Sequence, residues 1–304
     1  MKLAFLIAAH TQPELLARLA RRLRGPGSSI FIHIDQKADI RPFEKALREN
    51  DAGDFHLVPR ARSGWGTFGQ VRASLALLIS ALEYDREAER FILISGQDYP
   101  LMTPARMAAF FEANADTDFF TCHPLPWSEW EGNGGLDRLR RYHFPMGRYS
   151  FAYPSENLPG SRVARAAHAA CSLFLPQERP LPEEIALYGG SNWWNLTRHS
   201  AMAVLEFNLR HKRFRRMFRF TKSADEIYFQ TALLNSPSRQ PVEGDDLRCV
   251  FWDGRRDEHP AILRMEDYAE IAASRKLIAR KMEALFSLPL MERIDHELLG
   301  EDAR

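Results

Sequence analysis

The sequence predicts an α/β fold in which helices cover both faces of a mostly parallel central sheet. In the first 122 residues, short and continuously apolar runs alternate with amphipathic segments. Such runs are typical of strands that are buried on both faces, and strands connected through helices run parallel to one another. The chain has 304 residues and is 45% hydrophobic, so it is long and apolar enough to bury a large core.

The N-terminal elements follow this alternation in order. Five apolar runs are predicted strands, at residues 3–8, 30–34, 55–58, 91–94 and 119–122. Four amphipathic segments between them are predicted helices, at residues 13–23, 42–48, 69–84 and 104–111. Residues 95–100 are rich in turn-forming residues and are predicted to be a loop.

The rest of the chain is less regular. Residues 124–182 are rich in aromatic residues, Pro and Gly, and are predicted to form loops with short helices. Helices are predicted over residues 199–211 and 267–273, and a strand over 247–252. Residues 277–282 form a basic C-terminal stretch. No stretch has the composition of a linker, so the chain is predicted to be a single domain.

Polar residues follow several of the predicted strands. They are Ala9-His10, His33 to Asp35, and Gln97-Asp98. In open sheets of this kind, ligands bind at the carboxyl ends of the strands. The sequence therefore predicts a nucleotide site at this edge of the sheet.

An acid pair, Asp225-Glu226, stands between a basic run and a predicted helix. Ser223 is a predicted N-cap, and Glu226 lies three residues later, as in a capping box. A carboxylate in the first turn of a helix is stabilised as the anion, which also suits a general base. On the residues alone, the structural and the catalytic interpretation of Glu226 both stay open.

The composition argues against several classes of protein. With 41 basic and 40 acidic residues the net charge is +1, so no overall field favours nucleic acid. Three widely spaced cysteines form no CxxC pair and indicate neither a disulfide framework nor a zinc site. The apolar run at residues 3–8 fits a buried strand better than a signal peptide, and no run is long enough to span a bilayer. We expect a cytoplasmic protein.

One metal-like pattern is present, the D-x-D of Asp116 and Asp118. It precedes a predicted strand, whereas the ligand edge lies at the far end, so a metal role there is disfavoured. The sequence has no glycine-rich phosphate loop and no GxSxG elbow, which argues against a kinase, a P-loop protein or an α/β-hydrolase.

Spaced pieces of the chain resemble the core-2/I-branching enzyme family, which holds β-1,6-N-acetylglucosaminyltransferases and peptide O-xylosyltransferases. The resemblance covers roughly residues 2–285 in order. The pieces are 33–37 (HIDQK), Trp65-Gly66, 94–101 (ISGQDYPL), 190–193 (GSNW), 224–226 (ADE) with Phe229 and Thr231, 247–252 with Leu247-Arg248 and Trp252, and 279–281 (ARK).

The resemblance implies a GT-A-type fold, a UDP-sugar donor, inversion at the anomeric carbon, and no need for a metal or another cofactor. Glu226 matches the catalytic base, which takes the proton of the acceptor hydroxyl. Arg280 and Lys281 match the family's pair of basic residues that would neutralise the diphosphate in place of a metal. A solvated helix end is the alternative for these two cations.

Further site residues follow from the same resemblance. Ala9, His10 and Asp35 fall where the family holds uridine, and Trp65 and Asp98 fall at the rim of the donor pocket. Arg248 would contact phosphate or Glu226. Ser191, Asn192, Trp193 and Trp252 are predicted on the acceptor side. Two alternatives stay open, a core position for Trp252 and a helix-capping role for Asp98.

We therefore expect an inverting, metal-independent glycosyltransferase, with residues 1–122 on the donor side and 123–304 on the acceptor side. UDP-GlcNAc is favoured over UDP-xylose, because Asn192 stands where the xylosyltransferase branch would have an acid. The expected partners are a UDP-sugar and a glycan acceptor for polysaccharide biosynthesis, without nucleic acid; a peripheral membrane contact stays open. Alternatives are a xylosyltransferase, a non-catalytic glycan- or nucleotide-binding relative, and a metal-dependent enzyme using Asp116 and Asp118.

Overall fold

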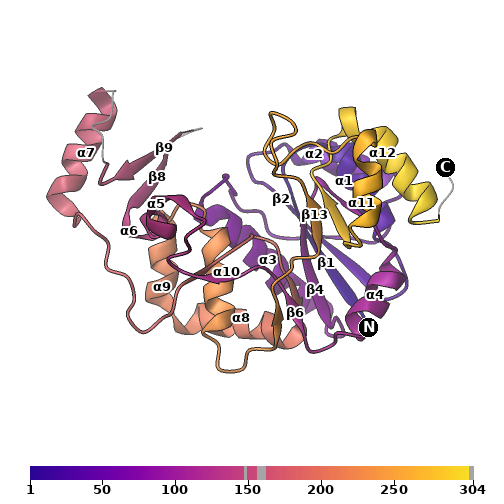
Figure 1. Cartoon of the computed structure of the whole chain (residues 1–304), viewed down its shortest axis with the longest axis horizontal. Coiled ribbons are helices and arrows are strands. Elements are labelled where there is room, and N and C mark those ends of the chain that lie inside the picture. Colours follow the sequence, from indigo (N-terminus) through magenta and orange to yellow (C-terminus); the bar gives the residue numbers. More distant parts are fainter. Residues whose placement is uncertain (147–148, 156–161, 301–304) are drawn as a thin grey trace.

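The core of the protein is a seven-stranded sheet. A computed structural model describes residues 1–146, 149–155 and 162–300 (Figure 1). The strand order is β12-β6-β11-β4-β1-β2-β3. Only β11 runs antiparallel to its neighbours, β4 and β6, so the prediction of a mostly parallel sheet is confirmed. The strands are β1 (Leu3–Ala9), β2 (Ser28–Ile34), β3 (His56–Leu57), β4 (Arg90–Ser95), β6 (Asp118–Phe119), β11 (Asn195–Thr197) and β12 (Val242–Glu243).

Helices cover both faces of this sheet, as predicted. Alternate residues of β1 show the two layers, because Phe5 and Ile7 belong to one apolar cluster while Ala4 and Leu6 belong to the other. Side chains of a strand alternate between the two faces. One face carries α1 (Pro13–Arg22), α2 (Ile40–Glu49) and α4 (Pro104–Glu112), and the other carries α3 (Phe68–Tyr84), α8 (Arg198–Arg210) and α10 (Asp225–Leu234).

A second, three-stranded sheet lies against the first and was only partly predicted. Its order is β13 (Arg248–Val250), β14 (Ile278–Arg280) and β5 (Asp98–Pro100). The predicted loop at residues 95–100 is therefore wrong for its second half, since Asp98 lies opposite Arg280 in an antiparallel pair. These strands pack with η2 (Met265–Asp267), α11 (Tyr268–Ala273) and α12 (Ala284–Glu297). The pairing carries the C-terminal basic residues to the edge of the main sheet.

The region predicted as loops with short helices contains more structure than expected. The short helices α5 (Glu131–Gly134) and α6 (Asp137–Arg140) are present, but a hairpin and a 13-residue helix follow them. The hairpin pairs aromatic residues across its strands, Tyr142 with Tyr153 and Phe144 with Phe151, and such pairs stabilise a sheet. We call β8 (Tyr142–Met146), β9 (Tyr149–Tyr153) and α7 (Arg162–Phe174) the arm. It projects from the left of the body in Figure 1.

The remaining elements link the arm to the body. A two-stranded sheet joins β7 (His123–Pro124) to β10 (Tyr188–Gly189), and α9 (Lys212–Met217) runs into η1 (Phe218–Phe220) just before α10. Within the three described ranges, no helix combines the length and the apolar character needed to cross a bilayer.

Candidate active site

The start of α10 carries Glu226, but the predicted capping box does not form. The N-cap residue is Ala224, and no side chain caps the helix. Ser223 has a φ of 48°, outside the extended conformation that a capping serine adopts. Its N–H donates to the carbonyl of Gly66 at 2.8 Å instead. The loop that carries Trp65 is thereby attached to the helix start.

Glu226 forms an ion pair with Arg138, a partner that was not predicted from the sequence. Its side chain is 34% exposed, and one carboxylate oxygen lies 2.5 Å from Nη1 of Arg138. The guanidinium of Arg138 in turn stacks on Trp130, 3.8 Å from the ring centroid. The expectation that Arg248 would reach Glu226 is therefore wrong. In the sequence, Arg138 is marked only as the first residue of a basic cluster at residues 138–143.

A short connecting segment, residues 190–193, joins Glu226 to the cations. The N–H of Gly190 donates to the carbonyl of Glu226 at 2.8 Å. A Cβ on Gly190 would lie 2.0 Å from the carbonyl oxygen of Thr121, so only glycine fits here. At the other end, the ring of Trp193 lies 4.8 Å from the guanidinium carbons of both Arg248 and Arg280.

Asp98 is the buried anchor of these arginines. Its carboxylate accepts hydrogen bonds from Arg280 at 2.8 Å and from the hydroxyl of Ser95 at 3.0 Å. Nε of Arg248 lies 3.8 Å away, and the side chains of Asp98 and Arg248 are both 0% exposed. Neither side chain is open to solvent, in contrast to the rim position expected for Asp98 and the phosphate contact expected for Arg248. Both lie behind Arg280, which is 18% exposed.

The capping role considered for Asp98 is also wrong. Thr103 caps α4, because its hydroxyl accepts the N–H of Arg106. Asp98 instead organises the loop from Ser95 to its own position through two hydrogen bonds from Ser95. A carboxylate that accepts three hydrogen bonds and lies beside a second arginine positions other groups rather than binding a ligand itself.

The carboxyl ends of the parallel strands meet at one edge. In register, Ala9 lies opposite Ile34, and Ala8 lies opposite Ser95. Burial lowers the pKa of His10, with Asp35 opposing that effect and Lys281 adding to it, so His10 lies within electrostatic reach of both. Burial also lowers the pKa of Lys281, and the charge of Arg280 lowers it further.

Ala9 and Asp35 connect the ends of two neighbouring strands at this edge. Ala9 is buried, and its carbonyl accepts the N–H of Asp35 at 2.8 Å. Burial alone would raise the pKa of Asp35, but hydrogen bonds from the N–H of Lys37 and from Ser63 hold it below its usual value. The Asp35 carboxylate is thus already occupied by three donors, at 2.7, 3.0 and 2.7 Å.

Two tryptophans stand open to solvent. Trp65 is 84% exposed and Trp252 is 65% exposed. The core position considered for Trp252 is therefore wrong. Exposed aromatic rings of this size are available to cover the apolar face of a sugar.

The profile of the Core-2/I-Branching enzyme family matches residues 3–274. This chain belongs to that family. The resemblance seen in the spaced pieces is thereby confirmed. Dog xylosyltransferase 2 is 23% identical over 319 residues, covering 99% of this chain and 34% of the relative. Human xylosyltransferase 1 is 22% identical over 322 residues, covering 99% and 31%. The chain spans about a third of the length of these curated relatives.

Among solved structures, S. aureus TarS 1–349 in complex with UDP aligns with 89% of this chain and 63% of that chain. The sequence identity is 13% and the TM-score is 0.38. At that score the likeness supports no conclusion about fold or ligand.

In this family member, Asp118, the second acid of the D-x-D pattern, serves the fold. Asp118 is 1% exposed. One of its oxygens accepts the N–H of Thr197 at 2.8 Å, and the other accepts the hydroxyl of Ser200. Within the described part of the chain, no group of three or more His, Cys, Asp or Glu side chains is placed to hold a metal. Asp118 therefore joins β6 to β11 and α8.

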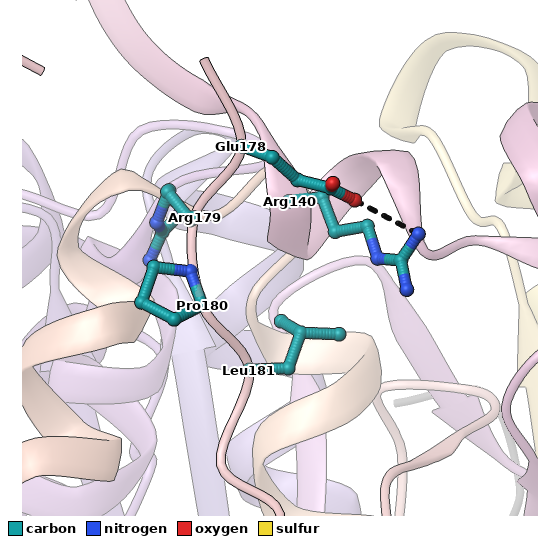
Figure 2. A pocket seen from close by; sticks show the side chains of 5 residues that line it. All are labelled: Arg140, Glu178, Arg179, Pro180 and Leu181. Carbon is teal, nitrogen blue, oxygen red and sulfur yellow. Dashed lines mark ion pairs between the residues drawn. The ribbon is translucent and has the colours of Figure 1, made fainter. Parts of the chain in front are cut away.

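A pocket of about 340 Å³ lies beside the arm and takes no part in this arrangement (Figure 2). It is lined by Arg140, Glu178, Arg179, Pro180 and Leu181. Arg140 and Glu178 form an ion pair of 2.9 Å, and Arg179 donates to the carbonyls of Arg141 and Phe220. None of the predicted site residues lines this pocket.

Asp225 is the second carboxyl at the helix start, and it is buried. Burial raises its pKa to about 7, and the neighbouring charge of Glu226 adds to this effect, while a hydrogen bond from Asn192 opposes it. Asn192, predicted on the acceptor side, thus contacts a carboxyl group that holds its proton in mildly acid solution. A neutral Asp225 avoids a second negative charge beside Glu226.

This raised pKa predicts a pH-dependent stability. In the unfolded chain the pKa is near 3.8, so between about pH 4 and 7 the folded state binds the extra proton, and the free energy of unfolding falls as the pH rises. Asp225→Asn should remove this dependence. Urea unfolding of both proteins from pH 4.5 to 7.5 measures it: the stability of the wild type relative to the variant should decline with pH, and parallel profiles would contradict the burial of an ionisable Asp225.

Proposed function

We propose that this protein is an inverting glycosyltransferase that moves a sugar from a UDP-sugar to a hydroxyl group of a glycan, with Glu226 as the general base. The supporting observation is the connecting segment. It joins the partly exposed carboxylate of Glu226 at one end to Arg280 at the other. Arg280 lies beside the edge where the carboxyl ends of the parallel strands meet. Family membership favours the same chemistry.

Each charge in the proposed reaction has a place. The acceptor oxygen attacks the anomeric carbon, and its proton passes to Glu226. The bond from that carbon to the UDP oxygen breaks on the opposite side, through an oxocarbenium-like transition state. The negative charge that develops on the diphosphate is stabilised by Lys281 and by Arg280, which Asp98 holds in place. Arg138 holds the carboxylate of Glu226 in one orientation.

We propose further that the reaction needs no metal ion. Arg280 and Lys281 supply the positive charge that a divalent ion would otherwise bring, while Asp118 is engaged within the fold. UDP release should be measured with excess EDTA and with added Mg²⁺ or Mn²⁺. We expect the same rate in all three conditions. Loss of activity in EDTA that Mn²⁺ restores would exclude this part of the proposal.

The favoured donor is UDP-GlcNAc, and UDP-xylose is the second candidate. Asn192 favours UDP-GlcNAc, because its amide contacts Asp225 and offers a sugar a neutral hydrogen-bonding partner rather than a charge. UDP-xylose is supported by the relatives at 22 to 23% identity, which carry the name xylosyltransferase. Thermal shifts with the two donors, well above their dissociation constants, distinguish them, because the donor that binds the native state raises its melting temperature. A larger shift with UDP-xylose would reverse the order.

A further inference from the structure

Helix α7 presents an apolar surface to solvent at the end of the arm. Val163 is 68% exposed, Leu173 is 78% exposed and Phe174 is 83% exposed. In Figure 1 the helix stands apart from the main body. It is attached through His168, whose ring lies 5.1 Å from that of Tyr153 in β9. Large apolar side chains gathered on one exposed element mark an interaction surface.

The sequence of α7 places these side chains on one face. Val163, Ala166, Ala170 and Leu173 follow one another at intervals of three, four and three residues, which is the spacing of one side of a helix. His168, on the opposite side, faces the hairpin. We call Val163, Ala166, Ala170, Leu173 and Phe174 the outer face.

The charge around the outer face is positive. α7 contains Arg162 and Arg165 and no acidic residue. The basic segment, residues 210–222, contains seven Lys or Arg and no Asp or Glu. Its exposed basic members are Arg210, Lys212, Arg213, Arg216, Arg219 and Lys222.

The basic segment adjoins the arm. The ring of Phe220 in η1 lies 5.3 Å from that of Phe144 in β8. The whole chain has a net charge of only +1, so this positive charge is a local concentration. It continues to Lys222, three residues before the first residue of α10.

We propose that the outer face of α7 and the basic segment form a docking surface for an anionic lipid bilayer. Apolar side chains of an interfacial helix enter the boundary between headgroups and acyl chains, and Lys or Arg side chains bind anionic headgroups. A second copy of the chain is a poorer occupant, because a symmetric contact would bring two positive surfaces together. Docking would hold the start of α10 near acceptors carried by the membrane.

Flotation of the full chain with lipid vesicles tests this surface. We expect binding to vesicles of phosphatidylcholine with phosphatidylglycerol, little binding to phosphatidylcholine alone, and weaker binding as salt increases. The double variants Leu173→Glu/Phe174→Glu and Arg216→Glu/Arg219→Glu should each lower the bound fraction at least about tenfold. Met202→Glu, at a 57% exposed position on α8, is the matched control and should bind like the wild type.

The outcome does not depend on sugar transfer, so it is separate from the test of the proposed function. Thermal melting curves of each variant serve as the control for correct folding. Absence of binding to both vesicle types, or wild-type binding by Leu173→Glu/Phe174→Glu, would overturn the proposal. So would a dimer in light scattering that this double variant dissociates, because a second copy would then cover the outer face.

Discussion

Glu226→Gln is expected to lower turnover by roughly 10² to 10⁴, the usual contribution of a general base, with little change in the affinity for UDP. Glutamine has the shape of glutamate, and its amide oxygen can still accept the hydrogen bond from Arg138. It cannot take a proton from the acceptor hydroxyl at neutral pH. The loss should therefore appear in kcat, while calorimetric titration with UDP should give nearly the wild-type Kd.

Glu206→Gln is the matched control for this prediction. Glu206 lies on the surface of α8 and pairs with Arg210 at 2.5 Å. Its replacement should leave both turnover and UDP binding unchanged. Near-normal turnover of Glu226→Gln would rule out Glu226 as the base. A fall in UDP affinity as large as the fall in turnover would assign Glu226 to donor binding instead.

Lys281→Ala should weaken the binding of UDP by about tenfold or more, and that of uridine hardly at all. Hydrogen bonds to charged groups contribute about 1.5 to 3 kcal/mol each, and uridine has no phosphate to receive one. Burial and the charge of Arg280 lower the pKa of Lys281, and the charges of Glu283 and Glu258 only partly oppose this. A bound diphosphate would add negative charge beside Lys281.

Titration calorimetry with UDP and with uridine measures the two affinities. Lys45→Ala is the control, since Lys45 lies on the surface of α2 and is 71% exposed, 3.9 Å from Glu49. It should bind both ligands like the wild type. Equal losses for UDP and uridine in Lys281→Ala would mean that Lys281 does not contact phosphate.

Most of the central fold follows from local patterns. The runs at residues 3–8, 30–34 and 91–94 became the three parallel strands in the middle of the sheet. A strand that is buried on both faces is recognisable in the sequence as a continuous apolar run. β5 has no such run, because its three residues lie in a turn-rich stretch and become a strand only when β14 pairs with them.

The arm shows the same limit. Tyr142 and Phe144 alternate with other residues, as do Phe151 and Tyr153, but each strand alone is short and irregular. The hairpin is stabilised by aromatic contacts across the strands and by Phe220, which contacts Tyr142 and Phe144 of β8 from a distant part of the sequence. Such contacts cannot be predicted from the composition of residues 124–182.

The sequence by itself determined the α/β class, the edge at which strand ends gather, and the family whose spaced residues it shares. These features depend on short-range periodicity and on the order of residues along the chain. Only the tertiary structure decided that Arg138 pairs with Glu226 across 88 positions, and that Asp98 and Arg248 lie enclosed behind Arg280. The physical reason is that charged and hydrogen-bonding groups pair according to their distance in space, and that distance is set by how elements far apart in the sequence pack together.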